Sequence, residues 1–399
     1  MGELTGRTDR PTAEELVEFR AHVRKVIAEH APPIVAREGH RAPLDDEQDA
    51  QLRRWFAALY HHGLVGADWP VEHGGREDHH PLHGPIVLEE ILLVRAPRPV
   101  DQTGLAAQIT LRFGTDEQKA YHLPRIRAAE SVWCQLLSEP DAGSDIANVR
   151  CRATVQPDGT FLVAGQKTWI TDGHWADWGV GLFRTDPASS RHHGLTMFYV
   201  PMRADGVEVR PIMTMAGSPD VNEVFFDDVR LGPEHVIGEV GSGWSVIMTG
   251  LDIERFGIGG NVVLLSMLYD DLLDVARHLT LQGGPAFDDS SVADAIAGFG
   301  IDALVARQVV DDHIDHALVG TDLPGGAAIA KIGFAETYNQ ISAYGVQLAA
   351  RGVLAPAGFE ALARLQDAWL WSRAYTLSGG SSEMMRNILA KRRLRLPAD

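Results

Sequence analysis

The middle of the chain carries short β-type runs with no helical pattern between them, and this limits the folds that the sequence can adopt. These runs are rich in β-forming residues and are separated by Gly, Pro and Asp; they span 150–156, 160–163, 180–183, 195–201, 207–211 and 223–229. Asp158-Gly159 lies between the first two runs and is typical of a hairpin turn. Since no crossover helices separate the runs, they predict an antiparallel sandwich or barrel.

Helical patterns precede and follow this β-rich region. Thr12-Ala13-Glu14-Glu15 reads as a capping box, and the helix that it opens should end at Pro32-Pro33. Further helical patterns run through 52–59, 86–94 and 115–126, and long helices are predicted at 244–278, 291–318, 327–350 and 358–376. The prediction is an α+β multidomain fold, with an N-terminal helical domain (1–132), a middle antiparallel β domain (133–243) and a C-terminal four-helix-type bundle (244–399).

The bulk composition limits the class of protein. The chain has 399 residues, of which 45% are hydrophobic and 23% charged, as in a folded protein rather than a disordered one. The formal net charge is −18, and the basic run 391–395 is typical of a solvated helix end, so we expect no nucleic-acid partner. An apolar run of about 18 residues and a basic-apolar leader are both missing from the sequence, which predicts a cytoplasmic protein without membrane contact.

The cysteines and histidines do not indicate a metal site. Cys134 and Cys151 are too few for a disulfide framework or a zinc site. The histidines at 61–62, 79–80, 83 and 192–193 lie among turn residues without Cys or carboxylates at ligand spacing. We therefore expect these histidines to face solvent, and we predict no metal.

Two segments carry the strongest functional signal, Leu137–Asp145 (LSEPDAGSD) and Gln166–Thr171 (QKTWIT). The first combines a turn-forming Pro with Gly and small hydroxyl residues, so its backbone N–H groups can approach a ligand closely. The second is a β-rich run with one large indole, Trp169, which is suited to lie flat against a planar ring. A lone Gly-Ser-Asp loop would mean little, but two such segments in this order form a strong signal.

Together these segments resemble the flavin-binding middle domain of the acyl-CoA dehydrogenase family, and the resemblance extends over nearly the whole chain. It implies the same order of helical, β and helical domains, with FAD as cofactor and an acyl-CoA as substrate. Leu137, Ser138 and Ser144 would lie in the loop that holds the flavin and the acyl-CoA. Trp169 and Thr171 would pack beside the isoalloxazine ring, where hydrogen bonds near N5 favour the arriving electron density.

The implied reaction is an α,β-dehydrogenation that gives a trans-2-enoyl-CoA, and it needs a carboxylate to take the α-proton. Many family members place this Glu in a C-terminal loop, where the matching segment 375–383 has Gly379 instead. A second subset places it on the first helix after the β domain, where the matching segment 250–255 contains Glu254 and Arg255. We therefore predict Glu254 as the base, with a pKa raised by burial, and Arg255 with Ser144 as substrate contacts.

Two alternatives remain for these carboxylates. Glu254 and Arg255 could form a structural ion pair or a surface charge instead of a catalytic group. Glu383 is the rival base, but its place after the C-terminal loop favours a helix cap or, together with Ser381, a flavin contact.

The resemblance is incomplete where the neighbouring subunit normally contributes to the flavin. Family members are dimers of dimers in which that neighbour donates an Arg-x-x-Phe-Gly segment and a Gln-x-x-Gly-Gly turn. Here 277–287 keeps an Arg, a Gly and a Phe without the spacing, and 347–352 has Ala350 and Arg351 in place of the paired Gly. Because side chains there obstruct the approach of backbone to pyrophosphate, we predict one subunit of a hetero-oligomer, with a homotetramer that binds flavin atypically as the alternative.

Other functions on the same fold stay open. The resemblance implies that electrons leave through an electron-transfer flavoprotein, as in lipid β-oxidation. The chain could instead be a non-catalytic subunit whose partner carries the chemistry, or a flavin oxidase or monooxygenase. A carrier-protein thioester could replace CoA, and the sequence does not define the length, branching or ring system of the acyl group.

Overall fold

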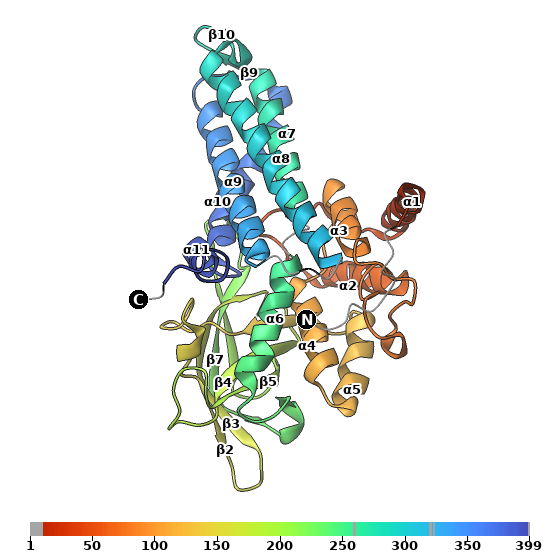
Figure 1. Cartoon of the computed structure of the whole chain (residues 1–399), viewed down its shortest axis with the longest axis vertical. Helices are drawn as coiled ribbons and strands as arrows, with labels where there is room; N and C mark the ends of the chain where they lie inside the picture. Colours follow the sequence, from red (N-terminus) through yellow and green to blue (C-terminus); the bar gives the residue numbers. More distant parts are fainter. Residues whose placement is uncertain (1–10, 258–260, 319–320, 322–323, 398–399) are drawn as a thin grey trace. The chain divides into compact units, whose positions relative to one another are not determined.

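A computed structural model describes residues 11–257, 261–318, 321 and 324–397, with no side-chain positions for 251–257, 317 and 318 (Figure 1). The chain divides into two compact units. The first unit consists of Met1–Ile34, His40–His80 and Pro97–Glu254, and the second of Val35–Gly39, Pro81–Ala96 and Arg255–Asp399. The first unit combines N-terminal helices with the β-rich region, and the boundaries 1–132, 133–243 and 244–399 stay predictions.

The helical part of the first unit follows the local signals of the sequence. It contains α1 (Ala13–His30), α2 (Asp46–His61), α4 (Asp101–Phe113) and α5 (Asp116–Arg127). The capping box is confirmed, because the Glu15 N–H donates to Thr12 Oγ1 at 3.2 Å and the Thr12 N–H donates to Glu15 Oε2 at 2.7 Å. The sequence pattern did not indicate α4, whose buried face consists largely of Ala and Thr.

The β-rich region forms one sheet in the order β6-β7-β3-β2-β4-β5-β8, with β1 paired to β4. The strands are β1 (Trp133–Leu136), β2 (Arg152–Val155), β3 (Phe161–Thr171), β4 (Trp178–Arg184), β5 (Leu195–Pro201), β6 (Val207–Ile212), β7 (Val221–Leu231) and β8 (Val236–Ile237). The predicted hairpin is confirmed as the antiparallel pair β2–β3. The sheet is mainly antiparallel as expected, although β1–β4 and β2–β4 are parallel.

Both faces of the central strands are buried. On β4, Leu182 belongs to a core that includes Leu105 and Ile109 of α4, whereas the adjacent Phe183 belongs to a core shared with β3, β5 and β7. Side chains alternate across a strand, so neighbouring residues serve the two cores in turn. The helices cover one face of the sheet, and the sheet encloses an apolar core at its other face.

Helix α6 (Gly243–Gly257) is attached to the first unit by glycines. A Cβ on Gly243 would lie 2.7 Å from the Thr196 backbone of β5, and the Gly241 N–H donates to Thr196 Oγ1 at 2.9 Å. Farther along, a Cβ on Gly250 would lie 3.2 Å from Ile109 Cδ1 of α4. These close approaches fix the course of the helix that carries Glu254.

The second unit is helical and its bundle differs in detail from the prediction. It contains α3 (His83–Leu93), α7 (Val263–His278), α8 (Ser290–Leu318), α9 (Gly326–Ala349), α10 (Phe359–Leu377), α11 (Ser382–Ile388) and a π-helical turn (Leu389–Arg393). Helices α7 to α10 lie side by side in Figure 1 and share an apolar core. The prediction of one helix over 244–278 was wrong, because α6 ends at Gly257 and α7 begins at Val263.

A small sheet lies at the turn after α7. It joins β9 (Leu279–Leu281), β10 (Gly284–Pro285) and β11 (Val353–Leu354) in the order β10-β9-β11. The sequence indicated only a break near residues 283–285, because strands of two or three residues are too short to show a period-2 pattern.

Candidate functional site

Trp169 stands in an unusual backbone conformation near the end of β3. Its φ is +59°, a left-handed value that is uncommon for residues other than Gly and costs free energy for a bulky side chain. The register of β3 against β7 shifts between Lys167 and Ile170, which marks a β-bulge at this point. The bulge leaves the indole 63% exposed, so Trp169 is not a core residue.

Hydrogen bonds on both sides of Trp169 hold this conformation. The Thr168 N–H donates to the Ser138 carbonyl at 2.9 Å, which joins β3 to the Leu137–Asp145 loop. The Asn222 side chain donates from Nδ2 to the Ile170 carbonyl at 2.9 Å, which joins β3 to β7. The structure therefore brings the two sequence segments together at one place, within one compact unit.

A buried ion pair between Lys167 and Glu139 lies beneath this junction. Lys167 Nζ donates to Glu139 Oε1 at 2.8 Å, and also to the carbonyls of Leu137 at 3.1 Å and Leu182 at 2.8 Å. Lys167 is 0% exposed and Glu139 only 7%. One ammonium group therefore uses three donors to join the loop, β3 and β4, and an ammonium group has three donors in all.

Glu139 is equally well satisfied. Its carboxylate accepts from the Arg150 N–H at 2.6 Å and the Cys151 N–H at 2.9 Å, in addition to Lys167. Burial by itself would raise the pKa of Glu139, but the Lys167 charge and these N–H donors outweigh burial and hold the pKa below its ordinary value. Glu139 is therefore ionised near neutral pH.

The loop that follows exposes its hydroxyl groups. Glu139 and Ala142 exchange backbone hydrogen bonds of 3.0 Å, which close a tight turn. Leu137 is buried, Ser138 is half-buried and Ser144 is exposed, while a Cβ on Gly143 would meet open space. The loop thus presents small polar groups on a surface fixed from below by the ion pair. Thr171, at the end of β3, is half-buried.

The C-terminal residues of the predicted site lie in the second unit. Ser381 Oγ accepts from the Met384 N–H at 3.3 Å, so Ser381 is the N-cap of α11. Glu383 is exposed in the first turn of this helix, and N-terminal backbone N–H groups with Ser381 lower its pKa. Gly379 and Gly380 precede them with φ values of +62° and +95°, a backbone that favours glycine.

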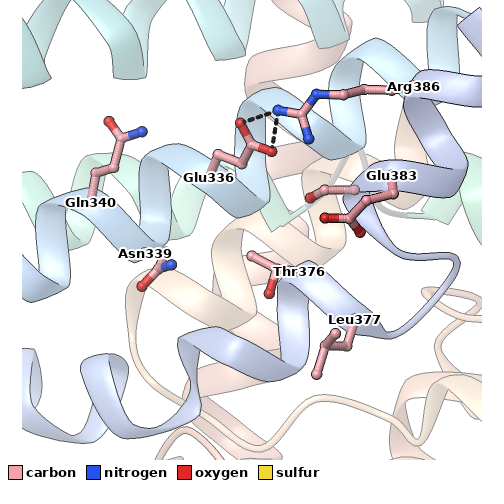
Figure 2. A pocket seen from close by; sticks show the side chains of 8 residues that line it. Glu336, Asn339, Gln340, Thr376, Leu377, Glu383 and Arg386 are labelled. Atoms are coloured by element: carbon pink, nitrogen blue, oxygen red, sulfur yellow. Dashed lines mark hydrogen bonds and ion pairs between the residues drawn. The ribbon is translucent and has the colours of Figure 1, made fainter.

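A pocket of about 290 Å³ lies beside this helix start (Figure 2). Polar side chains of α9, α10 and α11 dominate its lining, which consists of Glu336, Asn339, Gln340, Thr376, Leu377, Ser382, Glu383 and Arg386. The Arg386 guanidinium contacts both oxygens of Glu336, at 2.7 and 2.9 Å. Glu383 is therefore in a polar pocket rather than in an apolar one.

Glu254 and Arg255 lie on α6, but their side chains fall outside the described residues. The assignment of Glu254 as base and of Arg255 as substrate contact therefore stays a prediction. The histidine prediction needs one correction, since His79 is 9% and His80 only 1% exposed. In the described part of the chain, no three His, Cys, Asp or Glu side chains are grouped so that they could hold a metal ion.

Two segments, 277–287 and 347–352, correspond to those that the family resemblance assigns to the flavin of a neighbouring subunit. In this chain they make contacts within the second unit instead. Residues 279–285 form β9 and β10, and β11 pairs with β9 just after the 347–352 turn. Arg351 makes an ion pair with Asp289 at 3.3 Å. A Cβ on Gly352 would lie 2.2 Å from the Thr280 carbonyl oxygen, so this glycine serves the contact between the turn and β9.

Glu139 and Lys167 lie within the two motif segments, but the sequence pattern assigns them no role. Lys167 is the single charged residue of the Gln166–Thr171 segment, and Glu139 is the first charged residue of the Leu137–Asp145 loop. Because 28 positions separate them in sequence, only the fold shows that they meet.

Comparison with known proteins identifies the family. Three acyl-CoA dehydrogenase domain families match the chain: the N-terminal domain over residues 13–130, the middle domain over 134–229 and the C-terminal domain over 241–394. Acyl-CoA dehydrogenase IpdE1 of Mycolicibacterium smegmatis is 34% identical over 402 residues, covering 96% of this chain and 99% of that protein. The chain belongs to the acyl-CoA dehydrogenase family. It is therefore an enzyme of the oxidoreductase class.

Solved structures of this family have the same fold. The ChsE4-ChsE5 complex from Mycobacterium tuberculosis is 25% identical with a TM-score of 0.82, covering 98% of this chain and 100% of that chain. The Tcur3481-Tcur3483 steroid ACAD is 24% identical with a TM-score of 0.84, at 98% and 100% coverage. In the described part of this family member, no helix combines the length and apolar character needed to cross a membrane.

Replacing Lys167 by Met should destabilise the first unit by about 3–5 kcal/mol, because the Glu139 charge would stay buried without its partner. Chemical denaturation measures this cost, and limited proteolysis should show faster cleavage near residues 138–150. The double variant Lys167→Met, Glu139→Gln should recover part of the loss, because the neutral amide oxygen still accepts from the Arg150 and Cys151 N–H groups. A single variant as stable as the parent would show that the ion pair does not hold the loop.

The backbone at Trp169 makes a second prediction. Trp169→Gly should be more stable than Trp169→Ala by about 1 kcal/mol, since both lose the indole but only Ala keeps a Cβ at positive φ. At Leu162, which pairs regularly with β2 and β7, the usual order with Ala more stable than Gly should hold. Thermal and denaturant unfolding of the four variants gives the comparison, and equal stability of the two Trp169 variants would contradict strain at this position.

Proposed function

We propose that this enzyme catalyses the FAD-dependent α,β-dehydrogenation of an acyl-CoA to a trans-2-enoyl-CoA. The observation that carries the proposal is the exposed Trp169 indole, held in a strained bulge against a loop of small hydroxyl residues. Strain of this kind persists only where the surrounding structure holds it, and it is concentrated at functional sites. Bound FAD would supply the acceptor for the hydride that leaves the β-carbon.

The residues of the first unit fit a planar cofactor. The Trp169 indole offers an apolar face that would exclude water from one side of a ring system. Thr171, two residues along β3, would provide a hydroxyl donor to the ring edge. Leu137, Ser138 and Ser144 would complete the cofactor and substrate loop. Ser381 and Glu383, at the start of α11, are further proposed contacts to the cofactor.

Glu254 would take the α-proton of the thioester. The close approaches at Gly243 and Gly250 fix α6 to the sheet and to α4, and the base would benefit from this fixed helix. Gly379 has the backbone conformation of a glycine turn in the loop where other members carry their base, which favours α6 as its source. Arg255 and Ser144 would bind the polar part of the acyl-CoA.

Glu254→Gln should abolish reduction of the bound flavin by a suitable acyl-CoA. General bases contribute a factor of about 100 to 10,000 in rate, and the amide cannot accept the proton. The measurement is anaerobic bleaching of the oxidised flavin absorbance in a stopped-flow instrument. Glu383→Gln, which tests the rival base, should bleach far faster than Glu254→Gln, and the exposed Glu239→Gln, the matched control, should bleach at the parental rate. A Glu254→Gln protein that bleaches as fast as the parent would refute the assignment.

The same assay separates the alternatives on this fold. An oxidase or monooxygenase would consume oxygen without an added acceptor after reduction. A dehydrogenase would instead deliver its electrons to an electron-transfer flavoprotein, which is our expectation for this chain in lipid β-oxidation in the cytoplasm. A subunit whose partner carries the chemistry would bleach only in the mixed assembly, and Glu254→Gln would leave that bleaching unchanged.

We further propose that an unlike subunit completes the flavin site. The Arg351–Asp289 ion pair and the Gly352–Thr280 contact already occupy the turn that usually serves the neighbouring flavin. The similar ChsE4-ChsE5 structure from Mycobacterium tuberculosis is a complex, and this supports the idea. A homotetramer with atypical flavin binding is the alternative assembly.

The chain purified alone should therefore contain much less than one FAD per subunit. Co-expression with the unlike subunit should restore one flavin per mixed interface, because the partner supplies the missing contacts. Absorbance after denaturation measures the flavin content, and light scattering measures the assembly. One tightly held FAD per subunit in the isolated chain would reject the unlike partner and favour the homotetramer.

A further inference from the structure

A second group of charged side chains lies at the end of β3, directly after Thr171. Asp172 is 0% exposed and Asp220, in the turn before β7, is 1% exposed. The Asp172 N–H donates to the Asp220 carbonyl at 2.8 Å, so the two residues are neighbours. Arg41 faces both: its Nη2 lies 3.6 Å from Asp172 Oδ2, and its backbone N–H donates to Asp220 Oδ1 at 3.4 Å.

This group is incompletely hydrogen-bonded. Within the described residues, both carboxylate oxygens of Asp172, Oδ2 of Asp220 and Nε of Arg41 are buried without a hydrogen-bond partner. Buried polar atoms are almost always paired, and exceptions indicate an enclosed water, an ion or a functional role. Four such atoms on three residues that contact one another make this the strongest exception in the first unit.

The surrounding charges do not neutralise the two carboxyl groups completely. Arg41 divides its guanidinium between Asp172 and Asp101, since its Nη1 donates to Asp101 Oδ2 at 3.3 Å. The same Asp101 oxygen also contacts Arg98 at 3.3 Å. The other groups that face the pair are His174, the Ser218 hydroxyl and the buried Cys134 thiol.

Two buried carboxyl groups beside one shared arginine cannot both be ionised without a large cost. Burial and the neighbouring Asp172 raise the pKa of Asp220 to about 7. Burial also raises the pKa of Asp172, against the opposing charge of Arg41. Around neutral pH, one proton on the pair with the remaining negative charge facing Arg41 is therefore the arrangement of lowest cost.

We propose that Arg41, Asp172 and Asp220 are positioning residues for the strand end that bears Trp169 and Thr171: the two carboxyl groups share one proton, and the resulting ion pair with Arg41 holds this end of β3 against the turn before β7. The inference rests on the proposed function only in the role given to Trp169 and Thr171.

Asp172 and Asp220 are covalently adjacent to strand residues of the candidate site. Thr171 is paired with Val221, so Asp172 and Asp220 are the next residues on two paired strands. Asp172 itself has a φ of +55°, a strained value that its neighbours must hold. Loss of the shared proton would leave two carboxylates against half of one guanidinium, and their repulsion would separate β3 from β7 next to Thr171.

The pH dependence follows from the raised pKa of Asp220. The folded chain keeps a proton on Asp220 over a pH range in which the unfolded chain has lost it, so stability falls as pH rises from about 4 to about 7 and then levels off. Asp220→Asn keeps a neutral, hydrogen-bonding group of the same size. This variant should remove that fall, and its Tm should exceed that of the parent above pH 7.

The test uses the full chain at pH values from about 5 to about 9. Tm is followed together with the emission of Trp169, obtained as the difference between each protein and its Trp169→Phe derivative. In the parent, the Trp169 emission should change with a midpoint near pH 7; in Asp220→Asn this change should be lost. Asp205→Asn, at an exposed position of the same unit, should behave as the parent.

The outcomes separate the two proposals. A Trp169 emission that is independent of pH in the parent, or one that still titrates in Asp220→Asn, would overturn the inference. If Asp220→Asn fails to fold, Arg41→Gln provides the second variant, and its midpoint should move to higher pH because the positive charge that faces the pair is lost. Bleaching by acyl-CoA that is absent at every pH in the flavin-loaded assembly, with the Trp169 titration intact, would refute the proposed function and leave this inference standing.

Discussion

The ion pair between Lys167 and Glu139 is the interaction on which the candidate site depends. The Leu137–Asp145 loop, β3, β4 and the residue before β2 meet where these side chains are buried. Buried ion pairs contribute little net stability over well-packed apolar residues, but their geometry is demanding, and breaking one is costly. The main effect of the pair is therefore to hold the Leu137–Asp145 loop in place against β3. Its contribution to net stability is small.

Local signals in the sequence predicted the helices and strands well. Contacts between residues that are distant in sequence could not be predicted from it. The capping box at Thr12 and the hairpin at Asp158-Gly159 depend on residues that are close in sequence, and both were predicted. The order of helical, β and helical regions followed from periodicity alone. The division between α6 and α7 was missed, although glycines at 257, 259 and 260 provided a signal for a break.

The candidate site shows the same limit. The two motif segments were recognised from their residues and their resemblance to the family, but the positive φ of Trp169 depends on Ser138 and Asn222, which hold the residues on either side of it. Arg41, Asp172 and Asp220 come from three separate segments, so no local pattern could place them together. Serine, glycine and tryptophan gave the chemistry of the site, and tertiary hydrogen bonds determine its geometry.

The exposed face of Trp169 has a practical consequence. Met213 and Met215, in the turn that leads to Asp220 at the same end of the sheet, are 69% and 70% exposed. Large exposed apolar side chains at one end of a sheet favour self-association in concentrated solution. Preparations without the bound cofactor should therefore aggregate more readily than preparations that contain it. A planar aromatic compound added to crystallisation trials should reduce this aggregation.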